Sequence, residues 1–166
     1  ETPWGLSEFI KAAEMHNLPK VVSVQNAYNL LNRIYESGMS EFHHRSQVGL
    51  LAYSPLAQGY LTGKYLDGAR PAGARTTLFE RGQRYETEQA EEIVRKYVNL
   101  ANEYSMDPAL MANSFVNDQD FVTSNIIGAT TMEQLKIAVG SIDTKLDEEC
   151  LKKIEEIHYG CPNPCP

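Results

Sequence analysis

The run from Leu50 to Gly59, Leu-Leu-Ala-Tyr-Ser-Pro-Leu-Ala-Gln-Gly, constrains the fold of this chain more than any other segment. Its first residues are continuously apolar, as in a parallel strand that is covered on both faces. Pro55 cannot donate a ladder hydrogen bond, so the strand is predicted to end there. The ring of Tyr53 and the hydroxyl of Ser54 would then stand at the carboxyl end of a buried strand, where parallel α/β proteins bind their ligands.

Helical patterns and short apolar runs alternate along the rest of the chain. Strands are predicted near residues 21–24, 50–53 and 122–127, and a weak helix is predicted near residues 34–44. Further helices are predicted to start at the capping residues Thr2, Thr87, Asp107, Thr130 and Asp147. Glu133, three residues after Thr130, would complete a capping box there. The alternation predicts an α/β fold with a parallel sheet and right-handed crossovers.

Length and charge limit the classes of protein that this chain can represent. Residues 1–166 suffice for a single domain with its own core, and residues 160–166 form a tail rich in proline and cysteine. The net charge of −7 argues against nucleic acid or an anionic membrane surface as a partner. No apolar run approaches the ~20 residues of a membrane-spanning helix, and the first residues do not resemble a signal peptide. We therefore expect a cytoplasmic protein.

The three cysteines, Cys150, Cys161 and Cys165, do not suggest a disulfide framework, because their number is odd and low. A reducing compartment is the simpler interpretation. No further metal ligand stands near Cys161 and Cys165 at a suitable spacing, so no metal site is predicted. We expect a frayed tail with free thiols.

The segment from Gly128 to Leu135 is predicted to lead from a strand through a glycine into a capped helix N-terminus. The unpaired backbone N–H groups of such a terminus can bind an anion. A capping box without a ligand is the alternative. Its place on the last strand favours an anion site, because (β/α)8 barrels frequently bind phosphate with the loops after strands seven and eight.

Residues 56–85 lack strong periodicity and are predicted to form a long loop, which at that length is often functional. The loop carries the basic residues Lys64, Arg70, Arg75, Arg81 and Arg84 in an otherwise acidic chain. Such residues form either a phosphate clamp or a solvated surface. We expect a solvated surface for Arg70, Arg81 and Arg84.

Two residue types at predicted strand ends are suited to binding a ligand. Gln25 and Asn26 follow the first predicted strand, and a carboxamide there can both donate to and accept from an amide ligand. A turn residue that binds local backbone is the alternative, and it fits Asn26 better than Gln25. For Tyr53, a core tyrosine with a bonded hydroxyl and a ring exposed at a ligand site are equal alternatives.

These segments resemble the aldo-keto reductase family, most of all the branch that contains bacterial Tas-type proteins and the potassium-channel β-subunits. The matching runs are Val24-Gln25-Asn26, Ala52 to Leu56 with Gly63-Lys64-Tyr65, Gly73-Ala74-Arg75, and Ile127 to Thr130 with Glu133-Gln134-Leu135. The family fold is a (β/α)8 TIM barrel. The resemblance covers only its C-terminal half, namely the last three β/α units and the preceding helix.

The resemblance implies an NADP(H) site. Gln25 would bind the nicotinamide carboxamide, and Tyr53 would stack on the nicotinamide ring. The pyrophosphate would be lined by Ser54, Pro55, Leu56, Ala57 and Gln58, with Lys64 and Arg75 closing over it. Gly128, Thr130 and Gln134 would hold the adenosine end and its 2′-phosphate. Ile137 and Ala138 stand where the family commonly has an adenosine-contacting Glu and Asn.

The activity implied is NADPH-dependent reduction of aldehydes or ketones to alcohols, with a small carbonyl compound as substrate. The catalytic Asp, Tyr, Lys and His of the family lie on earlier strands that have no counterpart here, so we expect no catalytic residue in this chain. The alternatives are a non-catalytic NADP-binding or channel-β-like regulatory protein and an inactive truncated product. Expected partners are a missing N-terminal half-barrel or a second copy that pairs through the open sheet edges.

Overall fold

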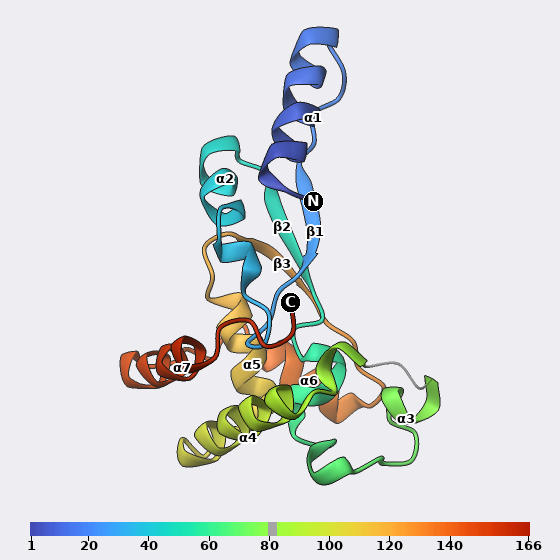
Figure 1. Cartoon of the computed structure of the whole chain (residues 1–166), viewed down its shortest axis with the longest axis vertical. Coiled ribbons are helices and arrows are strands. Elements are labelled where there is room, and N and C mark those ends of the chain that lie inside the picture. Colours follow the sequence, from blue (N-terminus) through green and yellow to red (C-terminus); the bar gives the residue numbers. More distant parts are fainter. Residues whose placement is uncertain (80–82) are drawn as a thin grey trace.

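The computed structural model describes residues 1–79 and 83–166 of the chain (Figure 1). Arg81 lies outside the described residues. In chain order the helices and strands are α1 (Pro3–His16), β1 (Ser23–Ala27), α2 (Met39–Ser46), β2 (Gly49–Tyr53), α3 (Arg75–Phe79), α4 (Glu88–Glu103), α5 (Pro108–Asn117), β3 (Val122–Ile126), α6 (Met132–Gly140) and α7 (Glu148–Gly160). Short 3-10 segments connect them at η1 (Ile34–Glu36), η2 (Ala57–Thr62), η3 (Leu66–Gly68) and η4 (Gln83–Tyr85).

The strands form a parallel three-stranded sheet in the order β1-β2-β3, which confirms the predicted α/β class. In the register, Gln25 lies opposite Leu51, and Leu51 lies opposite Ser124. Each consecutive strand is therefore the neighbour of the previous one, with helices in the connections. The carboxyl ends of all three strands point to the same end of the sheet.

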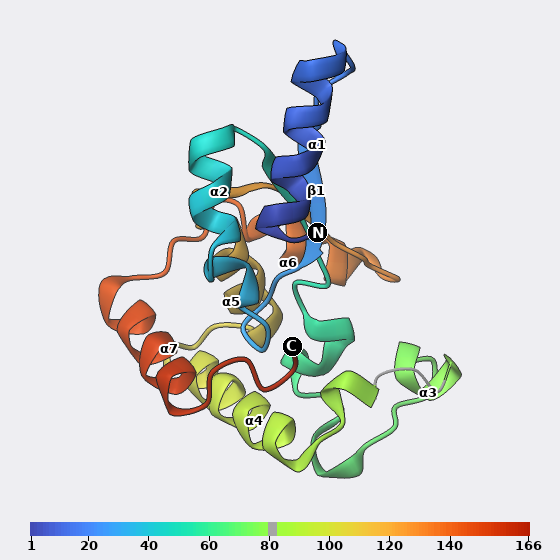
Figure 2. The ribbon, with the colours of Figure 1, turned by 45° about the horizontal axis from the view of Figure 1, so that its top comes forward.

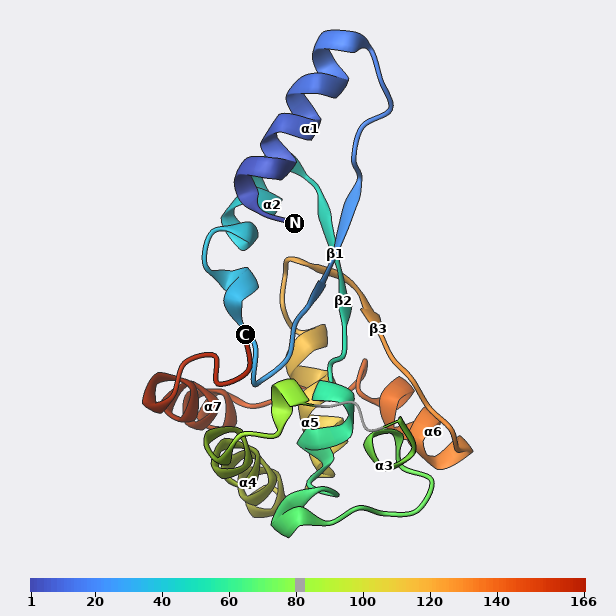
Figure 3. The ribbon, with the colours of Figure 1, turned by 45° about the vertical axis from the view of Figure 1, so that its right-hand side comes forward.

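One face of the sheet is packed and the other is open. Leu50 and Ala52 of β2 are fully buried, and Asn125 of β3 donates to the side-chain oxygens of Asn113 and Asn117 on α5. Figure 3 shows α2 and α5 on the same side of the strands. The alternate residues of the strands face the opposite side, and among them Gln25, Tyr53, Ser124 and Ile126 are exposed.

Local capping chemistry explains where most helices begin. The side chains of Thr2, Thr87, Asp107 and Asp147 accept hydrogen bonds from backbone amides in the first turns of α1, α4, α5 and α7. These starts agree with the predictions from sequence. The prediction for α6 was wrong by one residue, because Thr131 is its N-cap and accepts from the amide of Gln134.

The boundaries of the other elements depart from the sequence predictions. Strand β1 begins later and extends to Ala27, so Gln25 and Asn26 lie inside it, because pairing with β2 continues to the Ala27–Tyr53 pair. Gly38, with φ of 101°, separates η1 from α2 where one weak helix was predicted. The long loop contains η2, η3 and the short helix α3 in place of structureless chain.

The C-terminal tail is docked, not frayed as the sequence suggested. Figure 2 shows α7 beside α4, with the chain then returning toward the middle of the molecule. The Cys165 amide donates to the carbonyl of Leu31, and Asn163 Oδ1 accepts from the Arg33 amide at 2.6 Å. Cys165 is 1% exposed, and the three thiols are free. The tail thus closes over the segment that follows β1.

Candidate functional site

Tyr53 and Gln25 share the open face of the sheet. Tyr53 ends β2 and pairs with Ala27, two residues beyond Gln25 on β1, so successive pleats bring both side chains to one side. Tyr53 is 37% exposed, so its ring faces away from the core. The two residues come from neighbouring strands near their carboxyl ends, and both are available to one ligand.

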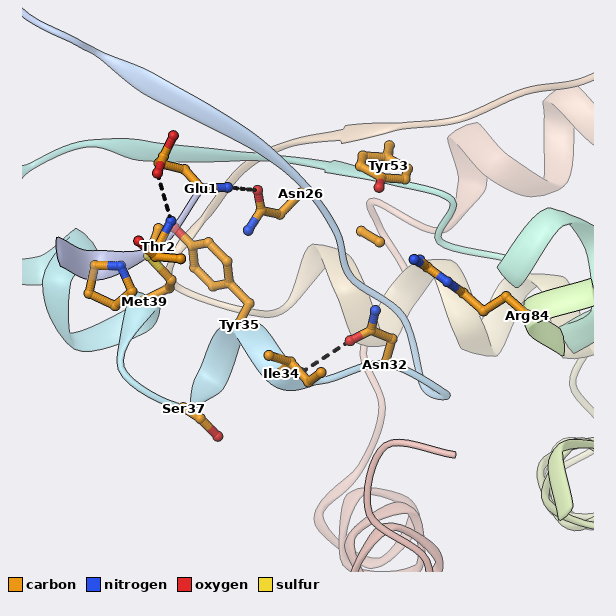
Figure 4. A pocket seen from close by; sticks show the side chains of 12 residues that line it. Glu1, Thr2, Asn26, Asn32, Ile34, Tyr35, Ser37, Met39, Tyr53 and Arg84 are labelled. Atoms are coloured by element: carbon orange, nitrogen blue, oxygen red, sulfur yellow. Dashed lines mark hydrogen bonds between the residues drawn. The ribbon is translucent and has the colours of Figure 1, made fainter. Parts of the chain in front are cut away.

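A pocket of about 300 Å³ lies beside Tyr53 (Figure 4). Asn26, Asn32, Tyr35 and Arg84 are among its other lining residues. Arg84 is exposed, as expected, but Figure 4 shows its guanidinium directed toward the pocket on the side of Tyr53 and Asn32. Sequence reasoning missed this position, because nothing local distinguishes Arg84 from Arg70, which instead pairs with Glu86 at 2.9 Å.

The backbone after β2 is held in an unusual conformation. Ser54, Ala57 and Gln58 have φ values of 57°, 49° and 57°, in the left-handed region that non-glycine residues rarely adopt. Such residues cost on the order of 1–3 kcal/mol each and cluster at ligand sites. Here the buried Asn29 holds the turn, because its Nδ2 donates to the Ser54 carbonyl at 3.0 Å. The turn is therefore preorganised by a contact from the β1–α2 connection.

Lys64 and Gln58 supply unpaired polar atoms next to this turn. The Lys64 ammonium packs so closely on Gly59 that a Cβ built there would lie 2.8 Å from Nζ. Within the described ranges, no carboxylate lies within 4 Å of this ammonium. The buried Gln58 Oε1 likewise has no hydrogen-bond partner in the part of the chain that the structure describes. A ligand with a phosphate fits the Lys64 ammonium.

Arg75 is connected to Lys64 through one tyrosine. The Lys64 ammonium lies 5.2 Å from the centre of the Tyr65 ring, and the Tyr65 hydroxyl accepts from the Thr76 amide at 3.2 Å. Arg75 precedes Thr76 at the start of α3 and is exposed. Tyr65 thus contacts the Lys64 ammonium with its ring and the backbone next to Arg75 with its hydroxyl.

The segment after β3 starts next to the segment after β2, because Ile126 pairs with Tyr53 in the sheet. Gly128, Thr130 and Gln134 are all exposed. The Thr130 amide and hydroxyl both bond to Gln134 Oε1, at 2.9 and 3.1 Å. Gln134 Nε2 donates no hydrogen bond among the residues that the structure describes. Among the described residues, no hydrogen bond joins Gln134 to Lys64 or Arg75.

Within residues 1–79 and 83–166, no group of three or more His, Cys, Asp or Glu side chains is arranged to hold a metal ion. Among the helices that the structure describes, none has the length and apolarity to span a bilayer.

Comparison with known proteins gives matches over nearly the whole chain. The profile of the Aldo/keto reductase family matches residues 3–158. Protein tas of Escherichia coli (strain K12) is 48% identical over 166 residues, which are 100% of this chain and 48% of that protein. An aldo-keto reductase of Babesia bovis is 37% identical over 99% of this chain and 60% of its own length.

A protein of Schizosaccharomyces pombe, named as a candidate voltage-gated potassium channel subunit beta, is 32% identical over 93% of this chain and 49% of its own length. The expected similarity to both the Tas-type proteins and the channel subunits is thereby confirmed. The chain spans about half the length of the curated relatives it matches.

Proposed function

Because this chain belongs to the aldo/keto reductase family of oxidoreductases, we propose that it carries most of an NADP(H) site in an enzyme that reduces aldehydes or ketones to alcohols. The family fold is a (β/α)8 barrel, and the parallel three-stranded sheet is consistent with part of one. The observation that carries the proposal is the Lys64 ammonium, which lies beside the left-handed turn at the end of β2 with no carboxylate of the described residues within 4 Å.

The proposed roles of the residues follow from their positions. Gln25 would pair with the nicotinamide carboxamide, and the Tyr53 ring would cover one face of the nicotinamide. Residues 54–58 would wrap the pyrophosphate, with Lys64 and Arg75 donating to its oxygens. Gly128, Thr130 and Gln134 would hold the adenosine end and its 2′-phosphate. Their exposure supports access for a nucleotide.

When bound, NADPH supplies the hydride that reduces the carbonyl carbon. The residues of this chain would orient the nicotinamide and neutralise the phosphates. They would not protonate the product oxygen, because we assign no acid–base residue to this chain. We propose that a tyrosine of the missing half of the barrel supplies that proton.

A non-catalytic NADP-binding or regulatory protein is the second candidate, and the similarity to the channel subunit of Schizosaccharomyces pombe favours it. An enzyme and a binding protein would differ in turnover and not in cofactor affinity. A truncated product without function would show neither property.

The test is an assay with NADPH and 4-nitrobenzaldehyde on two samples. One is the 166-residue chain, and the other is a chimera in which the preceding half of protein tas is joined to Glu1. We expect no turnover by the chain and turnover by the chimera. NADPH binding without turnover by the chimera would favour the regulatory protein, and neither binding nor turnover would favour the truncated product. Robust reduction by a monomer of the chain alone would contradict the assignment of the acid to the missing half.

A further inference from the structure

We infer that Tyr65 is the positioning residue for both phosphate-binding cations of the proposed site: its ring lies against the Lys64 ammonium, and its hydroxyl accepts from the backbone amide of Thr76, the residue after Arg75. The inference rests on the proposed function, because it concerns how that site is kept in shape.

The hydroxyl of Tyr65 takes the place of a missing helix cap. Helix α3 begins at Arg75, and the preceding residue, Ala74, has no side-chain acceptor for the first amides of the helix. The Thr76 amide instead donates to the Tyr65 hydroxyl at 3.2 Å, across eleven residues of sequence. Thr76 is itself buried, so this amide has no easy alternative partner in water. The bond fixes the turn from which Arg75 extends.

The ring of Tyr65 holds the second cation. The Lys64 ammonium lies 5.2 Å from the ring centre, within the range of cation–π attraction. The end of the Lys64 side chain also packs closely on Gly59, because a Cβ built there would lie 2.8 Å from both Cε and Nζ. Lys64 is therefore confined between the turn after β2 and the Tyr65 ring.

The Tyr65 ring is in turn fixed by its surroundings. It is 4% exposed and packs on the Tyr60 ring at 4.5 Å between centres. The Tyr60 hydroxyl donates to Glu86 at 2.6 Å, and Glu86 also accepts from Arg70 at 2.9 Å. Burial, together with the hydrogen bond to Glu86, raises the pKa of Tyr60 to about 12, so this donor keeps its proton at neutral pH. The network that supports the ring therefore extends from Tyr60 in η2 to Glu86, two residues before α4.

The variant Tyr65→Phe separates the two functions of the side chain. It keeps the ring beneath Lys64 and removes only the hydroxyl that caps α3. The loss of one hydrogen bond predicts NADPH binding that is about three- to tenfold weaker. If the effect passes through Arg75, adding Tyr65→Phe to Arg75→Ala produces little further loss. Tyr65→Leu, which also removes the ring, is expected to weaken binding more than Tyr65→Phe.

The experiment is a fluorescence titration of the chimera with NADPH, using Tyr65→Phe, Arg75→Ala, the double variant and Lys64→Ala. Tyr97→Phe is the matched control, because the buried hydroxyl of Tyr97 has no partner in the ranges described. The affinity of this variant for NADPH should not change. Circular dichroism melting establishes that each variant is folded.

Two results overturn the inference while the proposed function stands. One is unchanged affinity in Tyr65→Phe when Arg75→Ala and Lys64→Ala both weaken binding. The other is full additivity of Tyr65→Phe and Arg75→Ala, which would mean that the hydroxyl acts elsewhere. Unchanged affinity in Arg75→Ala and Lys64→Ala would instead overturn the proposed function.

Discussion

At the scale of single residues, Tyr53 offers the sharpest separation between binding and catalysis. Its exposed ring at the end of β2 suits stacking on a nicotinamide, and we assign its hydroxyl no part in proton transfer. Tyr53→Phe should therefore keep the turnover of the chimera, whereas Tyr53→Ala should weaken NADPH binding by about 1–2 kcal/mol. Steady-state kinetics and a binding titration measure the two effects. Loss of turnover in Tyr53→Phe alone would show that the role assigned to the ring is wrong.

Arg33 is a residue on which the fold itself depends. It is 7% exposed and pairs with Glu36 at 2.7 Å and with Glu155 at 2.8 Å. Burial would lower its pKa, but the hydrogen bonds to the two glutamates outweigh burial and raise it. The guanidinium thus joins the connection after β1 to α7, next to the segment that the tail covers.

Replacing Arg33 with Met should leave two partly buried carboxylates without their partner. We expect a loss of about 3–5 kcal/mol in the free energy of unfolding. The control is Arg45→Met, because Arg45 pairs with Glu41 at the surface and should contribute less than about 1 kcal/mol. Urea denaturation of the chimera measures both. Equal stabilities of the two variants would contradict the structural role of Arg33.

At the scale of elements, two neighbouring threonines at the start of α6 have different roles. Thr131 caps the helix, whereas Thr130 is bonded to the side chain of Gln134 outside it. Thr131→Ala should therefore destabilise α6 by about 1 kcal/mol, and Thr130→Ala by less. Amide hydrogen exchange in the first turn of α6 compares the two. Faster exchange in Thr130→Ala than in Thr131→Ala would favour the cap predicted from sequence.

Elements with local signals were predictable, and contacts between distant residues were not. Thr87 and Asp147 mark helix starts because a cap acts on amides two or three residues away. The apolar run before Tyr53 likewise predicted β2 to within one residue. The limits of β1 depend instead on pairing with β2, so its apolar residues alone misplaced the strand.

In the candidate site, too, the residues could be predicted from sequence, but the contacts between distant residues could not. Tyr53, Lys64 and Arg75 were proposed from sequence through matching runs. The contacts that organise them are long-range, as when Asn29 holds the carbonyl of Ser54 and Tyr65 holds the amide of Thr76. No periodicity or spacing encodes such contacts. The docking of Cys165 against Leu31 was missed for the same reason.

At the scale of the whole molecule, the main structural features are the open face of the sheet and its two edge strands, β1 and β3. Three strands cannot close a barrel that requires eight. Large apolar side chains are exposed on α1 and in the segment after it, among them Trp4, Phe9, Met15 and Val22. We propose that these surfaces are suited to packing against further strands and helices of a barrel.

The isolated chain should accordingly self-associate or remain partly molten. Its edge strands can pair with another copy, and the part of the chain that the structure describes leaves the other face of the sheet open. Multi-angle light scattering and binding of a hydrophobic dye test this expectation, with the chimera as the control. A monodisperse monomer that binds no dye would contradict the half-barrel interpretation.

We propose that this chain carries the phosphate-binding part of an NADP(H) site, and a titration with two cofactors measures that role. The chimera is titrated with NADPH and with NADH, alongside the variant Arg75→Ala and the control Lys96→Ala, whose lysine pairs with Glu92 at the surface of α4. We expect NADPH to bind more tightly than NADH, Arg75→Ala to lose about 1.5–3 kcal/mol of NADPH binding free energy, and Lys96→Ala to bind NADPH as before. Equal affinities for the two cofactors, or unchanged NADPH binding by Arg75→Ala, would contradict the proposal.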